Sequence, residues 1–112
     1  DDMIISGGEN IFPVEIESIL STHPAVDEVA VAGLRDERWG QRVAAFVKRR
    51  PGIVVDAAAL DAHCLGSRLP NFKRPRDYIF VRELPRSPVG KLLRRKLVSG
   101  DYLRDESAEP SA

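Results

Sequence analysis

Apolar residues come in short runs along the chain, and the first two runs are separated by glycines. Residues 3–5 and 10–12 flank the segment Ser6-Gly7-Gly8-Glu9. Adjacent glycines between apolar stretches favour a tight turn, so we predict a small N-terminal hairpin. Pro13 suits the first position of a helix, where its missing N–H is not needed. Apolar positions at helical spacing then predict one buried stripe before Pro24, made of Ile16, Ile19, Leu20 and His23.

The middle of the chain predicts strands and a second helix. Valine-rich or alternating segments indicate three strands, at residues 26–33, 42–48 and 78–81. The polar connection at residues 36–40 predicts that the first two strands pair antiparallel. Asp56 is a suitable N-cap for a helix that ends near Leu65, and residues 92–98 indicate a short basic helix.

Together these elements predict an α+β fold. We expect a small mixed or antiparallel sheet of about three main strands plus the N-terminal hairpin, packed with two to three helices. A chain of 112 residues fits one domain. We assign residues 1–98 to that domain and expect residues 99–112, rich in Asp, Glu, Ser, Pro and Ala, to be disordered. Such a fold class implies no function by itself.

Charge and cysteine content narrow the functional classes. Seventeen basic residues balance seventeen acidic ones, so the net charge does not indicate a nucleic-acid or membrane partner. Between Arg68 and Lys96, however, basic residues far outnumber the acidic residues Asp77 and Glu83, which suits an anionic small molecule or simply a solvated basic face. The lone Cys64 suits a reducing compartment.

The sequence lacks the patterns that direct a chain to a membrane or out of the cell. We find neither an apolar run of transmembrane length nor a signal-peptide pattern, and we expect a cytoplasmic protein. The chain begins with Asp1-Asp2 rather than methionine, which indicates a piece of a longer protein.

Four segments carry candidate chemistry. Gly7-Gly8 would let a backbone approach a ligand closely, although a simple hairpin turn explains the pair equally well. Lys91 follows glycine on a proline-rich loop, so it could supply a point charge to a phosphate or carboxylate, or be an ordinary exposed lysine. Its surroundings do not match a Walker A loop.

The other two segments contain aromatic residues. Phe72 stands beside Lys73, Arg74 and Arg76, a group that could stack a base and hold phosphates, or could be a basic surface loop with Phe72 in the core. Trp39, the single tryptophan, could wall a narrow channel or fill a packing gap.

In this order and spacing, the segments closely resemble the C-terminal domain of the acyl- and aryl-CoA ligases of the adenylate-forming enzyme superfamily. Residues 1–17, 72–76 and 84–91 look like the family's hinge region and later motifs, and the resemblance extends to about Leu97. The Ser-Gly-Gly-Glu-Asn segment favours the CoA-ligase branch over carrier-protein adenylating domains.

The resemblance implies an ATP-dependent, AMP-forming acid–thiol ligase with two half-reactions. ATP and a carboxylic acid give an acyl-adenylate, and CoA then displaces AMP. Asp1 matches the hinge at which the small domain rotates between steps, and Lys91 matches the adenylation lysine. Gly7, Gly8, Glu9 and Trp39 would line the path of the CoA arm, and Phe72, Arg74 and Arg76 would meet its nucleotide end. Two positions depart from the usual pattern: Arg76 replaces a lysine, and Pro88 stiffens the lysine loop.

The implied cofactors are ATP, with magnesium, and coenzyme A, and the implied partner is the ligase's own large N-terminal domain, absent from this chain. The acid cannot be read here, although a fatty acid is one candidate, and the fragment alone should be inactive. We assign no metal site, and His23, His63 and Cys64 are taken as structural. Two alternatives stay open: adenylation with another acceptor, such as a carrier-protein thiol, and a non-catalytic nucleotide- or CoA-binding module.

Overall fold

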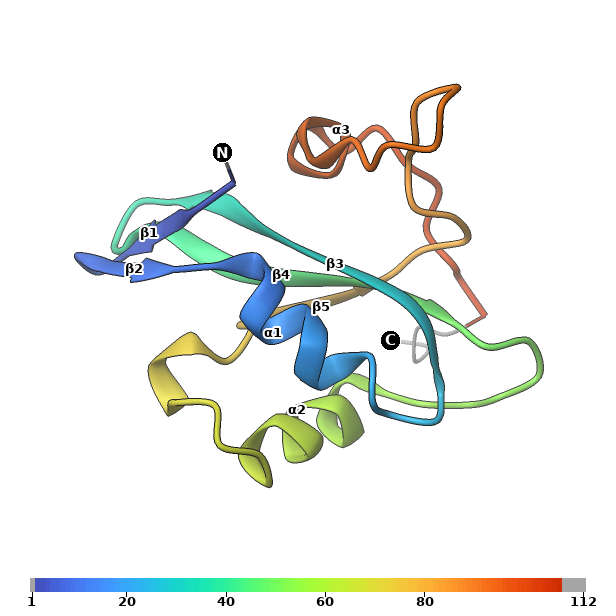
Figure 1. The fold of residues 1–112 in the computed structure, drawn as a ribbon, viewed down its shortest axis with the longest axis horizontal. Coiled ribbons are helices and arrows are strands. Elements are labelled where there is room, and N and C mark those ends of the chain that lie inside the picture. The colour runs from blue at the N-terminus through green and yellow to red at the C-terminus, as the bar shows by residue number, and fades with distance from the viewer. Residues whose placement is uncertain (1, 108–112) are drawn as a thin grey trace.

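The structure is a computed structural model, and it describes residues 2–107 (Figure 1). It confirms the predicted small α+β fold with two sheets. In chain order the elements are β1 (Ile4–Ser6), β2 (Glu9–Ile11), α1 (Pro13–Leu20), β3 (Val26–Asp36), β4 (Gly40–Arg49), α2 (Ala57–Leu65), the 3-10 helix η1 (Asn71–Lys73), β5 (Asp77–Phe80) and α3 (Arg94–Ser99).

The larger sheet has the order β3-β4-β5 and is mixed. β3 and β4 pair antiparallel as predicted, from Val26 opposite Arg49 to Asp36 opposite Gly40. β5 runs parallel to β4, with Ala44 opposite Asp77. A parallel neighbour needs a long crossover, and α2 supplies it between these two strands.

The N-terminal hairpin forms the second sheet, with Ser6 opposite Glu9 and a two-residue turn between them. Gly7 and Gly8 have φ values of 58° and 84°. Positive φ at both central positions characterises the type I′ turn, whose twist suits a hairpin and which only glycine adopts freely. The hairpin is held against the start of β4, because the Ile5 N–H donates to Gln41 Oε1 at 2.9 Å.

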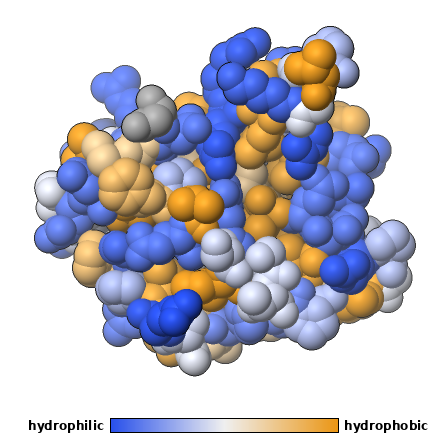
Figure 2. Space-filling view, in the orientation of Figure 1, coloured by the Kyte–Doolittle hydropathy of each residue, from blue (hydrophilic) through white to orange (hydrophobic). Residues whose placement is uncertain are grey.

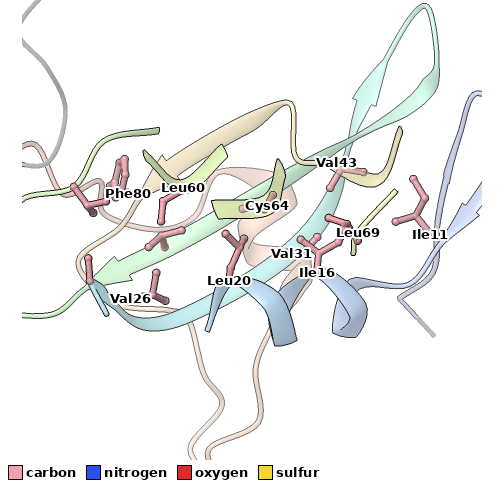
Figure 3. Close-up of a cluster of buried hydrophobic side chains, with 14 of the residues drawn as sticks. Ile11, Ile16, Leu20, Val26, Val31, Val43, Leu60, Cys64, Leu69 and Phe80 are labelled. Carbon is pink, nitrogen blue, oxygen red and sulfur yellow. The ribbon is translucent and has the colours of Figure 1, made fainter. Parts of the chain in front are cut away.

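The two faces of the larger sheet are covered differently. α1 and α2 lie on one face and α3 on the other (Figure 1). The main core lies between the larger sheet and the two helices α1 and α2, and Figure 3 shows it. Its labelled residues are Ile11, Ile16, Leu20, Val26, Val31, Val43, Leu60, Cys64, Leu69 and Phe80. Ala30, Ala44 and Phe46 point to the opposite face, where they meet Leu97 of α3.

The predicted stripe on the first helix is correct for its buried positions but not for its last member. Ile16 and Leu20 are fully buried, whereas α1 ends at Leu20 and His23 lies beyond it. The His23 ring is only partly buried, and its Nδ1 accepts a hydrogen bond from the Ala25 N–H at 3.0 Å. His23 therefore shapes the turn into β3 rather than the helix.

The segment after α3 differs from the disordered tail that we expected from residue 99. The Tyr102 ring packs edge-on against Phe46, with 5.5 Å between the ring centroids. The Asp105 N–H donates to the Phe80 carbonyl at 2.9 Å, and its carboxylate accepts from Arg49. This polar segment is ordered by backbone pairing with the residues at and just after the end of β5, since Val81 forms an antiparallel bridge with Arg104 and the Arg82 N–H donates to the Leu103 carbonyl at 3.0 Å. Residues 108–112 lie outside the described residues.

Candidate functional site

Three segments far apart in the sequence meet around the ring of Trp39. The Gly7 N–H donates to the Trp39 carbonyl at 2.8 Å. A Cβ atom on Gly7 would lie only 3.0 Å from Trp39 Cε3, so a side chain there would press on the indole. The Arg76 guanidinium carbon lies 4.6 Å from the ring centroid, a cation–π distance. The structure thus brings three predicted site residues together.

The loop between β3 and β4 holds Trp39 in place. Asp36 Oδ1 accepts the backbone N–H groups of both Arg38 and Trp39 at 2.9 Å, an arrangement typical of aspartate in turns. Gly40 follows with a φ of 83° and lets the chain enter β4 directly. Arg38 also approaches the ring, at 5.0 Å from its centroid. The Trp39 ring therefore lies close to two cations, Arg38 and Arg76, at the end of the sheet where β3 turns into β4.

A cleft of about 450 Å³ lies beside this cluster. It is lined by Ala57, Ala58, Asp61, Asn71, Phe72, Arg74, Pro75, Arg76 and Tyr78. Phe72 remains 51% exposed on η1, which decides against the alternative that it is a core residue. Arg76 lines the cleft and also contacts Trp39, so the two features share one guanidinium.

Arg74 is the most buried cation of this cleft. Its Nε lies 3.2 Å from Asp61 Oδ1 but outside hydrogen-bonding geometry, and within the described residues this buried Nε has no hydrogen-bond partner. The Tyr78 hydroxyl donates to the same Asp61 oxygen at 3.3 Å. A buried donor without a hydrogen bond is costly, and the attraction between the Arg74 guanidinium and the Asp61 carboxylate offsets part of that cost.

Tyr78 and Cys64 behind the cleft are suited to structure rather than catalysis. Burial raises the pKa of the Tyr78 hydroxyl far above its ordinary value, and it also raises the pKa of the Cys64 thiol. Both groups therefore stay protonated at neutral pH, and Cys64 is fully buried. A protonated, buried thiol is a poor nucleophile, which agrees with its structural assignment.

Lys73 does not join its two neighbouring cations. Its Nζ binds both carboxylate oxygens of Glu15 on α1, at 2.9 and 3.0 Å. The group Phe72, Arg74 and Arg76 is therefore the part of this segment that faces the cleft. Sequence reasoning missed Asp61 and Tyr78, because nothing in their local sequence indicates that both approach Arg74.

Lys91 lies on a small, tightly closed loop. The Gly90 N–H donates to the Ser87 carbonyl, and the Ser87 N–H donates to the Lys91 carbonyl, both at 2.8 Å. A type II turn would need a positive φ at Val89, but among the described residues only glycines have positive φ. Pro88 and Val89 are therefore the central residues of a type I turn, and Gly90 follows it with a φ of 87°. Pro88 thus occupies the turn position that suits its fixed φ. This position is compatible with the prediction that Pro88 stiffens the lysine loop.

The ammonium group of Lys91 is left open. Lys91 is exposed, and within residues 2–107 no carboxylate lies within ion-pair distance of it. The loop projects from the body in Figure 1, and Figure 2 shows hydrophobic colour at the projecting tip, in keeping with the 91% exposure of Val89. In Figure 1 the projecting part of the segment between β5 and α3 lies on the right of the view, whereas the hairpin of β1 and β2 lies on the left.

The remaining predicted site residues are placed less specifically. Gly8 and Glu9 are exposed beside Gly7, and a Cβ on Gly8 would meet no atom within 4 Å. The predicted hinge, Asp1, lies outside the described residues. In the described part of the chain, no group of three or more His, Cys, Asp or Glu residues could hold a metal ion. Residues 2–107 also contain no helix that is long and apolar enough to cross a membrane.

This fold, with an aromatic–cation cluster at one end and an open lysine at the other, matches a known domain. The family model for the AMP-binding enzyme C-terminal domain matches residues 15–91, and the chain belongs to this family. The match includes Trp39, Phe72, Arg74, Arg76 and Lys91. Its relatives include the 4-chlorobenzoate–CoA ligase of Pseudomonas sp. strain CBS-3, which is 57% identical over 98 residues, covering 88% of this chain and 19% of the relative.

Other relatives extend the similarity to different ligases. The 2-succinylbenzoate–CoA ligase of Geobacillus kaustophilus is 50% identical over 86% of this chain and 19% of its own length. Among solved structures, a fatty acyl CoA synthetase from Mycobacterium tuberculosis superposes with a TM-score of 0.82 at 45% identity, covering 88% of this chain and 19% of that one. The apo structure of MatB from Rhodopseudomonas palustris gives 0.86 at 38% identity, covering 89% and 20%. The chain thus spans about a fifth of the length of these relatives.

Proposed function

We propose that this chain is the C-terminal domain of an ATP-dependent, AMP-forming acyl- or aryl-CoA ligase. In the first half-reaction, a carboxylate oxygen attacks the α-phosphorus of ATP and pyrophosphate leaves, giving an acyl-adenylate. In the second, the thiol of coenzyme A attacks the acyl carbon and AMP leaves, giving a thioester. The ligase's own N-terminal domain, not part of this chain, completes each site, and Asp1 is the proposed hinge between the two.

The observation that carries this function is the separation of two different chemistries on one rigid domain. Gly7, Trp39 and Arg76 converge at one end, beside the cleft that holds Phe72 and Arg74. Lys91, with no carboxylate partner in the described part of the chain, projects from the other. A domain that turns between two half-reactions needs two such faces, one for each step.

The end with Trp39 suits the second half-reaction. Phe72 and Arg76 offer an aromatic ring and a guanidinium to an adenine and its phosphates, and the Arg74 guanidinium, ion-paired with Asp61, lines the same cleft. The hairpin turn carries no side chain at Gly7 or Gly8, and the extended arm of coenzyme A would run past Gly8 and Glu9 beside Trp39.

Lys91 suits the first half-reaction. The attacking carboxylate and the α-phosphate are both anionic, so an ammonium group placed between them lowers their repulsion and stabilises the charge of the transition state. ATP would enter as its magnesium complex, held by the N-terminal domain. The acid is a carboxylic acid of open type, since the relatives are named for 4-chlorobenzoate, 2-succinylbenzoate and long-chain fatty acids. A cytoplasmic location stays a prediction from the sequence.

The test is to assay the two half-reactions separately in the complete ligase and its Lys91→Ala variant. Pyrophosphate release is followed with ATP and a panel of aromatic and fatty acids, and thioester formation with supplied acyl-adenylate and CoA. We expect Lys91→Ala to slow adenylation by about a hundredfold or more and to leave most of the second step. Lys96→Ala is the matched control, because Lys96 lies on α3 with only a long ion pair to Asp101, at 3.8 Å.

The outcomes separate the alternatives. If both steps survive Lys91→Ala, the role of Lys91 is wrong. Pyrophosphate release without consumption of free CoA would indicate a different acceptor, such as a carrier-protein thiol. Absence of both steps in the unaltered ligase, together with retained binding of CoA or AMP, would indicate a non-catalytic binding module.

A further inference from the structure

The lysine loop is joined to the sheet by the side chain of Arg86. Arg86 Nη2 donates to Glu28 Oε1 on β3 at 2.7 Å, and Arg86 Nη1 donates to the Gly90 carbonyl at 3.1 Å. The Gly90 carbonyl belongs to the peptide bond that leads into Lys91. One planar guanidinium therefore connects the backbone immediately before the lysine to a strand 58 residues away in the sequence.

The other hydrogen bonds described for the loop are internal or lead toward α3. Ser87 closes the turn through its own backbone, and its hydroxyl accepts the Lys91 N–H at 3.1 Å. The Leu93 N–H donates to the Pro85 carbonyl at 2.9 Å. These bonds define the shape of the loop but not its direction relative to the sheet. In the described part of the chain, Arg86 makes the one hydrogen-bonded ion pair between residues 86–91 and β3.

Glu28 is a firm anchor, because it lies within a charge network on the central strand pair. Glu28 on β3 stands opposite Lys48 on β4, and Lys48 Nζ lies 3.7 Å from its carboxylate. Lys48 also binds Glu83 at 2.7 Å, and this hydrogen bond is the main cause of the raised pKa of Lys48. The end of the Arg86 bridge that rests on the sheet is thus held in turn by neighbouring strands and by the segment after β5.

We propose that Arg86 is a positioning residue for Lys91: it aims the lysine loop by bridging Glu28 and the Gly90 carbonyl. This role rests on the proposed function, since it assigns Arg86 to adenylation alone. A catalytic ammonium must reach its place within a fraction of an ångström, and a misplacement of about 1 Å can cost a hundredfold in rate. The fork of arginine can donate to two acceptors in a fixed plane, whereas a lysine ammonium on a flexible stem cannot reproduce that geometry.

The test compares Arg86→Ala, Arg86→Lys and Glu28→Ala in the complete ligase, with Arg82→Ala as the matched control. Arg82 is exposed nearby, and in the described part of the chain its side chain has no ion pair. For each variant, kcat of adenylation, KM for ATP, the rate of thioester formation from supplied acyl-adenylate, and the melting temperature are measured.

We expect Arg86→Ala to lower kcat of adenylation about tenfold, with KM for ATP, the second half-reaction and the melting temperature nearly unchanged. Arg86→Lys should resemble Arg86→Ala, because charge alone does not bridge two acceptors. The double variant Arg86→Ala/Glu28→Ala should be no slower than Arg86→Ala, since both changes break the same bridge.

Several results would overturn this role. Wild-type adenylation in Arg86→Lys would mean that only the positive charge matters. Equal loss in both half-reactions, or a large fall in melting temperature, would make Arg86 a structural residue. These failures are distinct from failure of the proposed function, because that is judged from Lys91→Ala: if Lys91→Ala does not slow adenylation, the function itself is wrong, whatever Arg86 does.

Discussion

The two ends of the domain are organised on opposite principles. At the Trp39 end, the groups are held by one another: the Gly7 N–H donates to the Trp39 carbonyl, the Arg76 guanidinium lies over the indole, and Arg74 pairs with Asp61. At the Lys91 end, the backbone is held by a closed turn and an arginine bridge, while the Lys91 ammonium has no carboxylate partner within residues 2–107. The first end is shaped before any ligand arrives, and the second presents a charge.

The proposed function explains this difference between the two ends. A binding surface gains affinity from groups that are already in place, because less freedom is lost on binding. A cation that stabilises developing charge must not be neutralised beforehand, so a carboxylate partner for Lys91 within the domain would weaken it. The acidic side chains near the loop are instead engaged by Arg86 and Lys48.

The comparison is most sharply tested at Gly7. Gly7→Ala should slow thioester formation by roughly a hundredfold and leave adenylation nearly intact, because the new Cβ would lie 3.0 Å from Trp39 Cε3 and displace the indole. Both half-reactions of the complete ligase are measured as above. Gly52→Ala is the matched control, since Gly52 lies outside the proposed site and also has positive φ, at 76°, with no atom within 4 Å of the added Cβ.

Because both substitutions place an alanine at positive φ, their difference isolates the contact with Trp39. Equal losses in the two variants would show that backbone strain alone matters. Loss of adenylation in Gly7→Ala would contradict the separation of the two ends.

A second test asks how firmly the lysine end is attached to the start of the chain. Arg94 on α3 donates to Glu17 at 2.7 Å and to Asp2 and the Val31 carbonyl, each at 3.1 Å. Arg94→Ala should lower the free energy of unfolding by about 1–3 kcal/mol, because it removes charge-assisted hydrogen bonds at a largely buried position. Urea denaturation of this chain measures it.

Arg95→Ala is the control for Arg94→Ala, since Arg95 is exposed and, among the described residues, has no ion pair. A change within 0.5 kcal/mol is expected for it, as for most surface substitutions. If Arg94→Ala were equally mild, α3 would not be fixed to Asp2, and the Lys91 loop would lack a rigid connection to the segment next to the proposed hinge.

Local sequence signals predicted most elements of this fold. The glycine pair at the hairpin, Pro13 at a helix start and Asp56 as an N-cap all act within a few residues, and the structure confirms each, with Asp56 Oδ1 accepting the Ala59 N–H at 2.8 Å. Two features escaped prediction: the direction of β5 and the docking of the segment around Tyr102. Both depend on partners distant in the sequence.

The same limit applies to the candidate site. Phe72 and Lys91 lie in segments that resemble family motifs, and Trp39 was singled out as the one tryptophan of the sequence. The residues that hold them were not identified, because the pairings of Asp61 with Arg74 and of Arg86 with Glu28 join distant segments. The sequence also could not show that Lys73 differs from Arg74 and Arg76. Lys73 pairs with Glu15, whereas the two arginines line the cleft.

The smallest expected effect concerns Asp105, in the segment that covers the sheet face behind the lysine end. Its carboxylate accepts from the Ser107 hydroxyl at 2.6 Å and from Arg49 Nε at 3.2 Å. These bonds lower the pKa of Asp105, with the Ser107 bond as the largest cause. A carboxyl whose pKa is lower in the folded state contributes stability above its unfolded pKa, and this contribution is lost as pH falls through the folded pKa.

Asp105→Asn should therefore cost less than about 1 kcal/mol at neutral pH and should make the loss of stability below about pH 4 less steep. Urea denaturation between pH 3 and 7 measures both, with Asp101→Asn, at a highly exposed aspartate, as the control for lost charge. Neither half-reaction should change, because Asp105 supports the sheet rather than either end. An unaltered acid profile would mean that the segment around Asp105 does not contribute to folding, whereas slower adenylation would mean that it also helps to aim the lysine loop.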